Sequence, residues 1–216
     1  MKPLSRALIG SLLIAGWPAA HAADGQKIFN QGGQNPAAMA CLGCHGADGK
    51  GIAAAGFPRL AGLSAGYLAK QLRDFRSGTR QQPVMEPLAK AMSDDEIHAV
   101  SQYLAALPAD PAPDLRRQQI APDPITRLAL YGDWQRNIPG CVQCHGPGGA
   151  GIGEHFPPLS GQPAAYLAAQ LDAWRGGTRS NDPNQLMVGV AKAMTADEVK
   201  AISEFFAQLA RQEAKP

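Results

Sequence analysis

The sequence of 216 residues contains one five-residue motif twice, and the two copies hold all four cysteines of the chain. The motifs are Cys41-Leu42-Gly43-Cys44-His45 and Cys141-Val142-Gln143-Cys144-His145. Cys-x-x-Cys-His is the attachment signature of a c-type haem. Two thiols at this spacing can form thioethers with both vinyl groups of one haem, and the adjacent histidine then ligates the iron. We therefore expect two covalent haem c groups. Their attachment residues would be Cys41, Cys44, Cys141 and Cys144, and their first axial ligands His45 and His145.

Other chemistry known for Cys-x-x-Cys fits this chain less well. A redox dithiol of the thioredoxin type lies near a βαβ pattern, and the sequence has none. A structural zinc site needs four ligands, whereas each motif supplies three. Two disulfides in an exported chain would leave both histidines unexplained.

The first 22 residues have the pattern of a secretory signal peptide. Lys2 and Arg6 form a short basic region before an apolar run over residues 8–17, and Ala20-His21-Ala22 then offers a cleavage site of small residues. The run is shorter than the roughly 20 residues of a membrane-spanning helix. We expect cleavage after Ala22 and a periplasmic protein, with an uncleaved membrane anchor as the alternative.

The charge balance argues against a nucleic-acid-binding protein. The chain has 20 Lys and Arg residues against 18 Asp and Glu residues, and two of the basic residues lie in the leader, so the mature chain is balanced at 18 against 18. No basic cluster with interleaved aromatic residues occurs, and haem carboxylates would add negative charge. We expect redox proteins as partners, and no nucleic acid.

A repeat extends through the rest of the chain. The segment Phe57-Pro58-Arg59-Leu60-Ala61-Gly62 returns as Phe156-Pro157-Pro158-Leu159-Ser160-Gly161. The offset between copies changes from 99 to 102 near the end, so the second copy carries three extra residues near 181–185. The repeat and its flanks predict a signal peptide over 1–22, a first domain over 23–108, a proline-rich linker over 109–124 and a second domain over 125–216.

Periodicity within each copy predicts helices and no strand of useful length, so the expected fold class is all-α. Residues 25–31 and 125–134 suit a helix before each motif, and residues 67–77 place apolar side chains on one helical face. Ser93-Asp94-Asp95-Glu96 and Thr195-Ala196-Asp197-Glu198 have the pattern of a capping box at the start of a final helix.

The second axial ligand of each iron separates an electron carrier from an enzyme. Alignment of the two copies from their shared end pairs Met85 with Met187, and Met92 with Met194. We predict Met85 and Met187, in extended loops, as the ligands. Met92 and Met194 precede helix caps and are predicted to be core residues. If all four only pack, each iron would be open or ligated by histidine.

Other polar residues near the motifs have more than one interpretation. His98 is expected to face solvent, and His155 has no counterpart in the first copy. We expect His45 and His145 to donate their other ring N–H to backbone carbonyls of the Phe-Pro segments. Four repeated arginines either pair with haem carboxylates or are exposed at helix ends: Arg76, Arg80, Arg175 and Arg179.

The duplicated haem motif, the Tyr-Leu-x-x-Gln-Leu-x-x-aromatic-Arg segment and the methionine segment followed by a capping box together resemble the dihaem cytochrome c4 family, over residues 24–210. The resemblance implies two tandem cytochrome c-like domains related by internal duplication and a pseudo-twofold axis. It also implies a periplasmic carrier that passes electrons from a quinol-oxidising complex towards a terminal haem–copper oxidase, often near the membrane surface. The chain departs from the family at Leu63, where the second copy keeps Gln162, and at Arg127, which we align with Gly25.

Three functions are consistent with these features. The first is a stand-alone electron shuttle of the respiratory chain, which is not itself an enzyme. The second is the dihaem subunit of a periplasmic dehydrogenase, such as flavocytochrome sulfide dehydrogenase. The third is an enzyme with an open iron site, for example one that oxidises thiosulfate or reduces peroxide.

Overall fold

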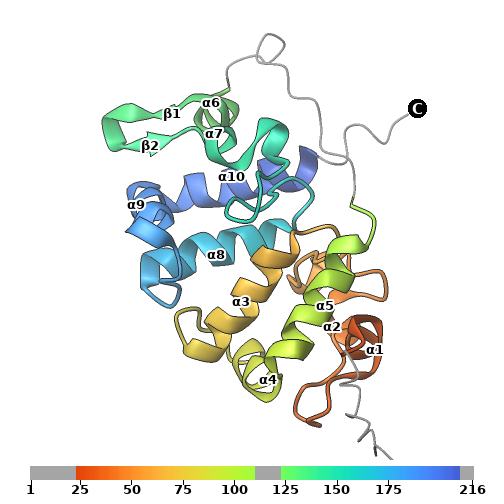
Figure 1. Ribbon diagram of the computed structural model, residues 1–216. Helices are drawn as coiled ribbons and strands as arrows, with labels where there is room; N and C mark the ends of the chain where they lie inside the picture. Colours follow the sequence, from red (N-terminus) through yellow and green to blue (C-terminus); the bar gives the residue numbers. More distant parts are fainter. Residues whose placement is uncertain (1–22, 110–122, 210–216) are drawn as a thin grey trace, which may run out of the picture.

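Each copy of the repeat folds into a helical module, and the two modules lie side by side in the computed structural model (Figure 1). The structure describes residues 23–109 and 123–209, so the predicted signal peptide and most of the predicted linker lie outside the described residues. The first module contains α1 (Gly25–Gln31), α2 (Leu42–His45), α3 (Ala65–Ser77), α4 (Met85–Ala91) and α5 (Asp94–Ala106). The second contains α6 (Pro124–Tyr131), α7 (Cys141–His145), α8 (Ala164–Gly176), α9 (Leu186–Ala193) and α10 (Ala196–Leu209).

The second module also contains a short β-hairpin that the periodicity does not predict. The helix expected over 125–134 ends at Tyr131, because Gly132 has a φ of 76° and its amide caps the helix by donating to the Leu128 carbonyl. Strands β1 (Gly132–Asp133) and β2 (Ile138–Pro139) then pair antiparallel. The all-α class is otherwise confirmed.

Both predicted capping boxes begin the final helices. The Glu96 amide donates to Ser93 Oγ at 3.2 Å, and the Ser93 amide donates to the Glu96 carboxylate at 2.8 Å. Thr195 and Glu198 exchange the same two bonds, at 3.2 and 2.8 Å. These bonds satisfy amides that the first turn of a helix leaves without an intrahelical acceptor.

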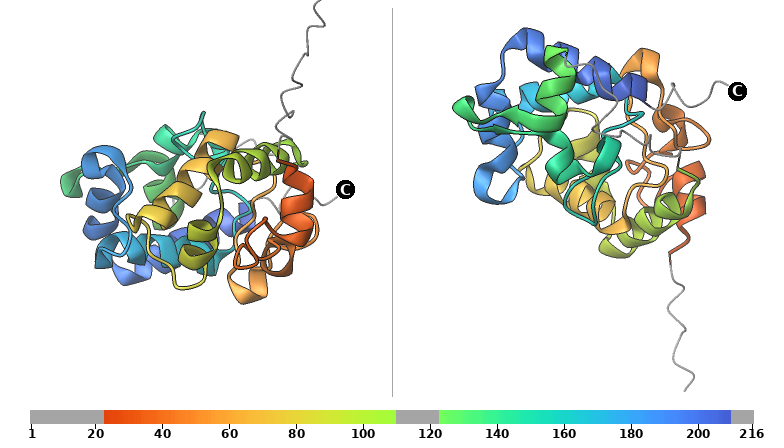
Figure 2. Two further views of the ribbon diagram at one scale, coloured as in Figure 1. Left: turned by 60° about the horizontal axis from the view of Figure 1, so that its bottom comes forward. Right: turned by 90° about the horizontal axis from the view of Figure 1, so that it is seen from above.

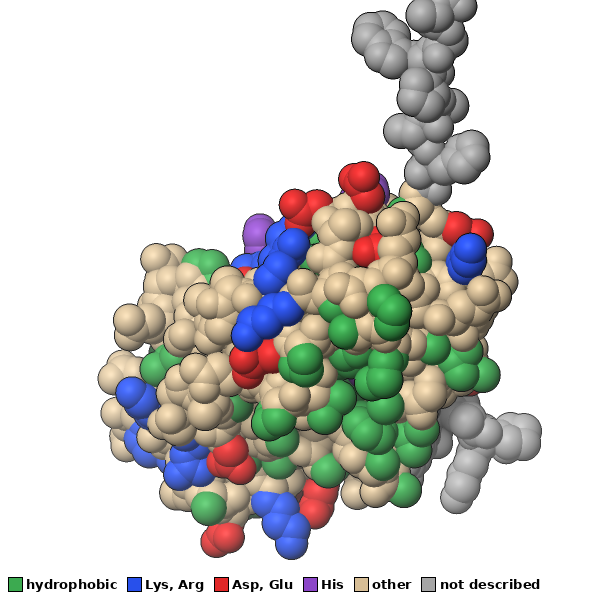
Figure 3. All heavy atoms as spheres, turned by 90° about the horizontal axis from the view of Figure 1, so that it is seen from below, with side chains coloured by type: hydrophobic (Ala, Val, Ile, Leu, Met, Phe, Trp, Pro, Cys, Tyr) green, Lys and Arg blue, Asp and Glu red, His purple; other side chains and the backbone are tan. Residues whose placement is uncertain are grey.

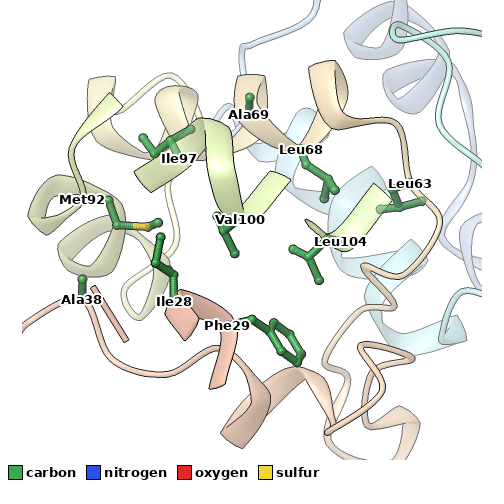
Figure 4. Close-up of a cluster of buried hydrophobic side chains, with 10 residues drawn as sticks. All are labelled: Ile28, Phe29, Ala38, Leu63, Leu68, Ala69, Met92, Ile97, Val100 and Leu104. Carbon is green, nitrogen blue, oxygen red and sulfur yellow. The ribbon is translucent and has the colours of Figure 1, made fainter. Parts of the chain in front are cut away.

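The core of the first module forms where α5 packs against α1 and α3. Figure 4 shows the buried apolar side chains that these helices contribute, together with Met92 after α4. In the second module, α10 packs against α6 and α8 in the same way, and Met194 joins that core. The prediction that Met92 and Met194 are core residues is therefore confirmed.

The contact between α1 and α5 requires a glycine. A Cβ added to Gly25 would lie 2.1 Å from the Ala99 carbonyl oxygen, which is backbone and cannot move aside cheaply. The expectation that Arg127 takes the place of Gly25 is wrong. The helix caps Gly32 and Gly132 align the two helices with an offset of 100, and Arg127 is exposed.

The modules meet along α3 and α8, which lie next to one another in Figures 1 and 2. Beyond these helices, the chain after each forms a one-residue antiparallel bridge, Arg80 with Arg179. The Gln81 amide donates to the Thr178 carbonyl and the Ser180 amide to the Thr79 carbonyl, both at 2.8 Å. Such reciprocal contacts are those of a twofold arrangement. None of the described helices is both long and apolar enough to cross a membrane.

Candidate haem centres

The second haem motif opens onto a cavity of about 450 Å³. Cys141, Cys144 and His145 line it from α7, and Met187 lines it from α9. The remaining lining is mostly apolar. Residues of α3 in the first module also contribute, so the second cavity is completed by its neighbour: Tyr67, Lys70 and Gln71.

Both motif histidines are oriented by a backbone carbonyl, as predicted. His45 Nδ1 lies 3.0 Å from the Pro58 carbonyl oxygen, and His145 Nδ1 lies 2.8 Å from that of Pro157. Burial lowers the pKa of both imidazoles, although each carbonyl hydrogen bond acts in the opposite direction. A neutral imidazole that donates from Nδ1 keeps the lone pair of Nε2 for a metal.

The Phe-Pro segments also pack against these rings. The ring centroids of His45 and Phe57 lie 6.3 Å apart, and those of His145 and Phe156 lie 6.0 Å apart. Each segment therefore holds its histidine twice, through a carbonyl and through a neighbouring aromatic ring.

The four cysteines are free of disulfides. Burial raises the pKa of Cys41 to about 11 and that of Cys141 to about 12. A thiolate is the form that attacks a disulfide or binds zinc. The raised pKa of these two thiols argues against the redox-dithiol alternative, which needs a reactive thiolate.

The methionine segments differ from the extended loops that the sequence predicts. Met85 is the first residue of α4, and Met187 lies in the first turn of α9. Gln82 Oε1 accepts from the amides of Val84 and Met85, both at 2.7 Å, which replaces intrahelical bonds at that helix start. The second copy carries its three extra residues near 181–185, and within this segment Asn184 and Gln185 have positive φ values of 61° and 55°.

The other two histidines flagged by the sequence lie at the surface. His98 is exposed, as predicted. His155 is also exposed, although it contributes to the rim of the second cavity.

The four repeated arginines divide into two pairs. Arg76 Nη2 donates to Asp94, and Arg175 Nη1 donates to Asp172 at 3.3 Å, so these two are helix-end residues within their own modules. Arg80 and Arg179 are 6% and 4% exposed and lie between the modules. The four arginines therefore do not share one role, either as partners of haem carboxylates or as exposed helix-end residues.

Arg80 and Arg179 form the centre of a polar cluster that spans the interface. Arg80 donates to Gln71 at 2.9 Å, and across the interface to Tyr166 at 2.9 Å and Gln170 at 2.7 Å. Arg179 donates to Gln170 at 2.9 Å, and across the interface to Gln71 at 3.1 Å. We call the five residues Gln71, Arg80, Tyr166, Gln170 and Arg179 the interface cluster.

Sequence reasoning missed the interface cluster, although a signal for it was present. Gln71 and Gln170 repeat on the helical face that carries apolar side chains, where a polar residue must find a buried partner. Gln162, in the loop before α8, is another buried polar residue with a distant partner: its side chain accepts from the Arg59 amide at 3.0 Å and donates to the Arg59 carbonyl at 2.9 Å. Partners about 100 residues away cannot be read from the local pattern.

The residues present fit a haem with its carboxylates. Arg179 lines the second cavity and its named hydrogen bonds go to neutral glutamine oxygens, so a buried positive charge lies where a haem carboxylate would be stabilised. Trp174 Nε1 is a further group that could bind a carboxylate, because this N–H is buried without a hydrogen-bond partner among the described residues. The apolar cavity supplies the space and the motif the anchoring atoms. A haem bound there would supply one-electron redox chemistry.

Comparison with known proteins agrees with this reading. The cytochrome c family profile matches residues 22–108 and 135–210. The chain is 56% identical to the thiosulfate dehydrogenase electron acceptor of Stutzerimonas stutzeri (strain A1501), over 99% of both chains. It is 35% identical to cytochrome c4 of Pseudomonas aeruginosa (strain PAO1), over 94% of this chain and 98% of the other.

A solved structure shares the arrangement. Thiosulfate dehydrogenase (TsdBA) from Marichromatium purpuratum, in its as-isolated form, superimposes with a TM-score of 0.75 at 46% identity. The match covers 85% of this chain and 39% of that one, so the chain spans well under half of the solved protein.

Fold, site and relatives together define a class: a tandem, dihaem electron-transfer cytochrome. The chain belongs to the cytochrome c family, in the form typified by cytochrome c4, and carries two covalent haem c groups.

Proposed function

We propose that this protein is a periplasmic electron carrier that accepts electrons from a thiosulfate dehydrogenase. The observation that carries the proposal is the 56% identity, over 99% of both chains, to an electron acceptor of that enzyme. This identity favours the dehydrogenase-linked role over the oxidase-directed shuttle expected from cytochrome c4. In the favoured role, thiosulfate rather than sulfide is the source of electrons. A terminal oxidase then fits as the destination of the electrons.

In the proposed protein, Cys41, Cys44, Cys141 and Cys144 attach the haems, and the axial pairs are His45 with Met85 and His145 with Met187. Support for Met187 comes from the second cavity, which it lines together with His145. Met194 also lines this cavity, but it is 5% exposed and belongs to the apolar core of the module. Methionine ligation raises the reduction potential and closes the iron to substrate. An iron without a vacant position suits a carrier and not an enzyme. The same proposal includes a signal peptide over 1–22, domains over 23–108 and 125–216, and a linker over 109–124.

Exposed apolar residues recur beside both proposed ligand sets. Ile52 and Ile152 each follow a motif histidine by seven residues, and are 38% and 50% exposed. Val84 and Leu186 directly precede the two methionines, and are 45% and 44% exposed. On the face seen in Figure 3, positive and negative side chains are interspersed beside an apolar area. Such a surface suits brief docking of a protein better than binding of a polyanion.

The test follows haem reduction in the oxidised holoprotein. Thiosulfate alone should leave both haems oxidised. Thiosulfate with a catalytic amount of thiosulfate dehydrogenase should reduce both haems, one electron to each. Reduction by thiosulfate alone would indicate an enzyme with an open iron. Failure of reduction with the dehydrogenase present, in a protein that dithionite still reduces, would exclude the proposed partner.

A further inference from the structure

The indole of Trp174 is a buried donor without a partner. Trp174 lies near the end of α8 and lines the second cavity together with His145 and Met187. Its Nε1 is buried and has no hydrogen-bond partner among the described residues. A buried N–H without an acceptor costs free energy, so native proteins almost always supply one.

A positive charge lies against the same ring. The guanidinium carbon of Arg179 is 4.0 Å from the centroid of the Trp174 ring. Burial and the neighbouring charge of Arg80 lower the pKa of Arg179, so an anion beside this pair would relieve an unfavourable environment. The haem carboxylates are anions that the cofactor itself brings to the cavity.

The first module repeats the stacking without the donor. Phe75 occupies the position of Trp174, and the guanidinium carbon of Arg80 lies 4.5 Å from its ring centroid. The two modules therefore share a cation over an aromatic ring, but only the second offers an N–H there. We propose that Trp174 Nε1 donates a hydrogen bond to a carboxylate of the second haem, and that this bond makes the two haems unequal.

The bond would act on the electron equilibrium of the second haem alone. A donor to the carboxylate offsets its negative charge, and negative charge near the iron favours the ferric form. Loss of the donor should therefore lower the ratio of reduced to oxidised second haem. We expect a change on the order of threefold, because only the part of the bond strength that differs between oxidation states counts.

The experiment uses Trp174→Phe, which copies the first module, with Phe75→Trp as its reciprocal. Redox titration of the holoproteins, with the two haems resolved by their shifted NMR methyl signals, should show the second haem harder to reduce in Trp174→Phe and the first unchanged. Phe75→Trp should make the first haem easier to reduce. Equal shifts of both haems, or none, in a protein with both haems attached would overturn the proposal.

A measurement on the unaltered protein covers the case in which a variant does not fold. With tryptophan labelled by ¹⁵N, the indole signal of Trp174 should show a hydrogen-bonded shift that changes between ferric and ferrous protein. Trp134, which is 65% exposed, serves as the internal reference. Asp182 Oδ1 is the competing acceptor, because it also lacks a partner in this cavity. An indole signal that responds to Asp182→Asn but not to oxidation state would assign the bond to Asp182 and overturn the proposal.

Discussion

At the scale of single residues, the two copies orient the motif histidine through the same kind of hydrogen bond. Each motif histidine is buried and held through Nδ1 by a carbonyl of the Phe-Pro segment. Each proposed methionine ligand begins a short helix, but the helix starts differ: Gln82 caps the Met85 segment, while Asp182 accepts from the Val188 amide at 3.0 Å beside Met187. The histidine side of each site is therefore duplicated more faithfully than the methionine side.

The methionine assignment predicts a spectroscopic loss confined to one haem at a time. Met85→Ala and Met187→Ala should each remove half of the weak long-wavelength band that arises from methionine sulfur bound to ferric iron. Met92→Ala is the matched control, since Met92 lies 8% exposed in the core. It should lower stability by about 2–5 kcal/mol and keep the band. A band that survives in Met187→Ala, or disappears in Met92→Ala, would contradict the assignment.

At the scale of elements, short helices depend on their ends. Six of the ten described α-helices have eight residues or fewer, and helices of that length are marginal without caps and packing. The hairpin of the second module is itself tied to a cap: Arg136 donates to both carboxylate oxygens of Glu198, at 2.9 and 2.6 Å, while Glu198 completes the capping box of α10. One carboxylate thus joins the hairpin to the final helix.

The Arg136–Glu198 pair predicts a pH dependence of stability. Hydrogen bonds from the Arg136 guanidinium lower the pKa of Glu198 from 4.5 to about 2. A lowered pKa stabilises the folded state at pH values above the unfolded value, and this contribution disappears as the pH falls from 4.5 towards 2. Glu198→Gln should therefore lower the melting temperature at neutral pH, with a difference from wild type that narrows over this window.

The matched control is Glu204→Gln, on the exposed face of the same helix. It should leave the melting temperature nearly unchanged at every pH. A constant difference between Glu198→Gln and wild type from neutral pH to pH 2 would show that the carboxylate charge contributes nothing.

At the scale of the whole molecule, the modules form one unit through buried polar contacts. The interface cluster places two guanidiniums next to one another, and each reaches a glutamine of the opposite module. Removing one member of such a network leaves buried groups without partners, which costs more than the bond itself contributes. The relative position of the modules therefore follows from this contact and not from the linker alone.

This network predicts that Arg80→Ala separates the modules. Thermal unfolding should change from one transition to two, and the radius of gyration from small-angle scattering should rise, because the cross-module bonds to Tyr166 and Gln170 are lost. Arg76→Ala removes an arginine that pairs within its own module and should change neither. A single transition and an unchanged radius in Arg80→Ala would show that the cluster does not hold the modules together.

Much of this protein is determined locally and can be read from its sequence. The haem motifs, the carbonyls that orient their histidines and the capping boxes each depend on residues within about a dozen positions, so their spacing suffices. The repeat then predicts two helical modules.

Other features depend on distant residues. Gln71 and Arg80 have polar side chains of many uses, and only the approach of α8 makes them an interface. The second cavity likewise takes part of its lining from the first module. Tertiary structure decided these features, because a buried polar group is defined by its partner, and these partners lie about 90 to 110 residues away in the chain.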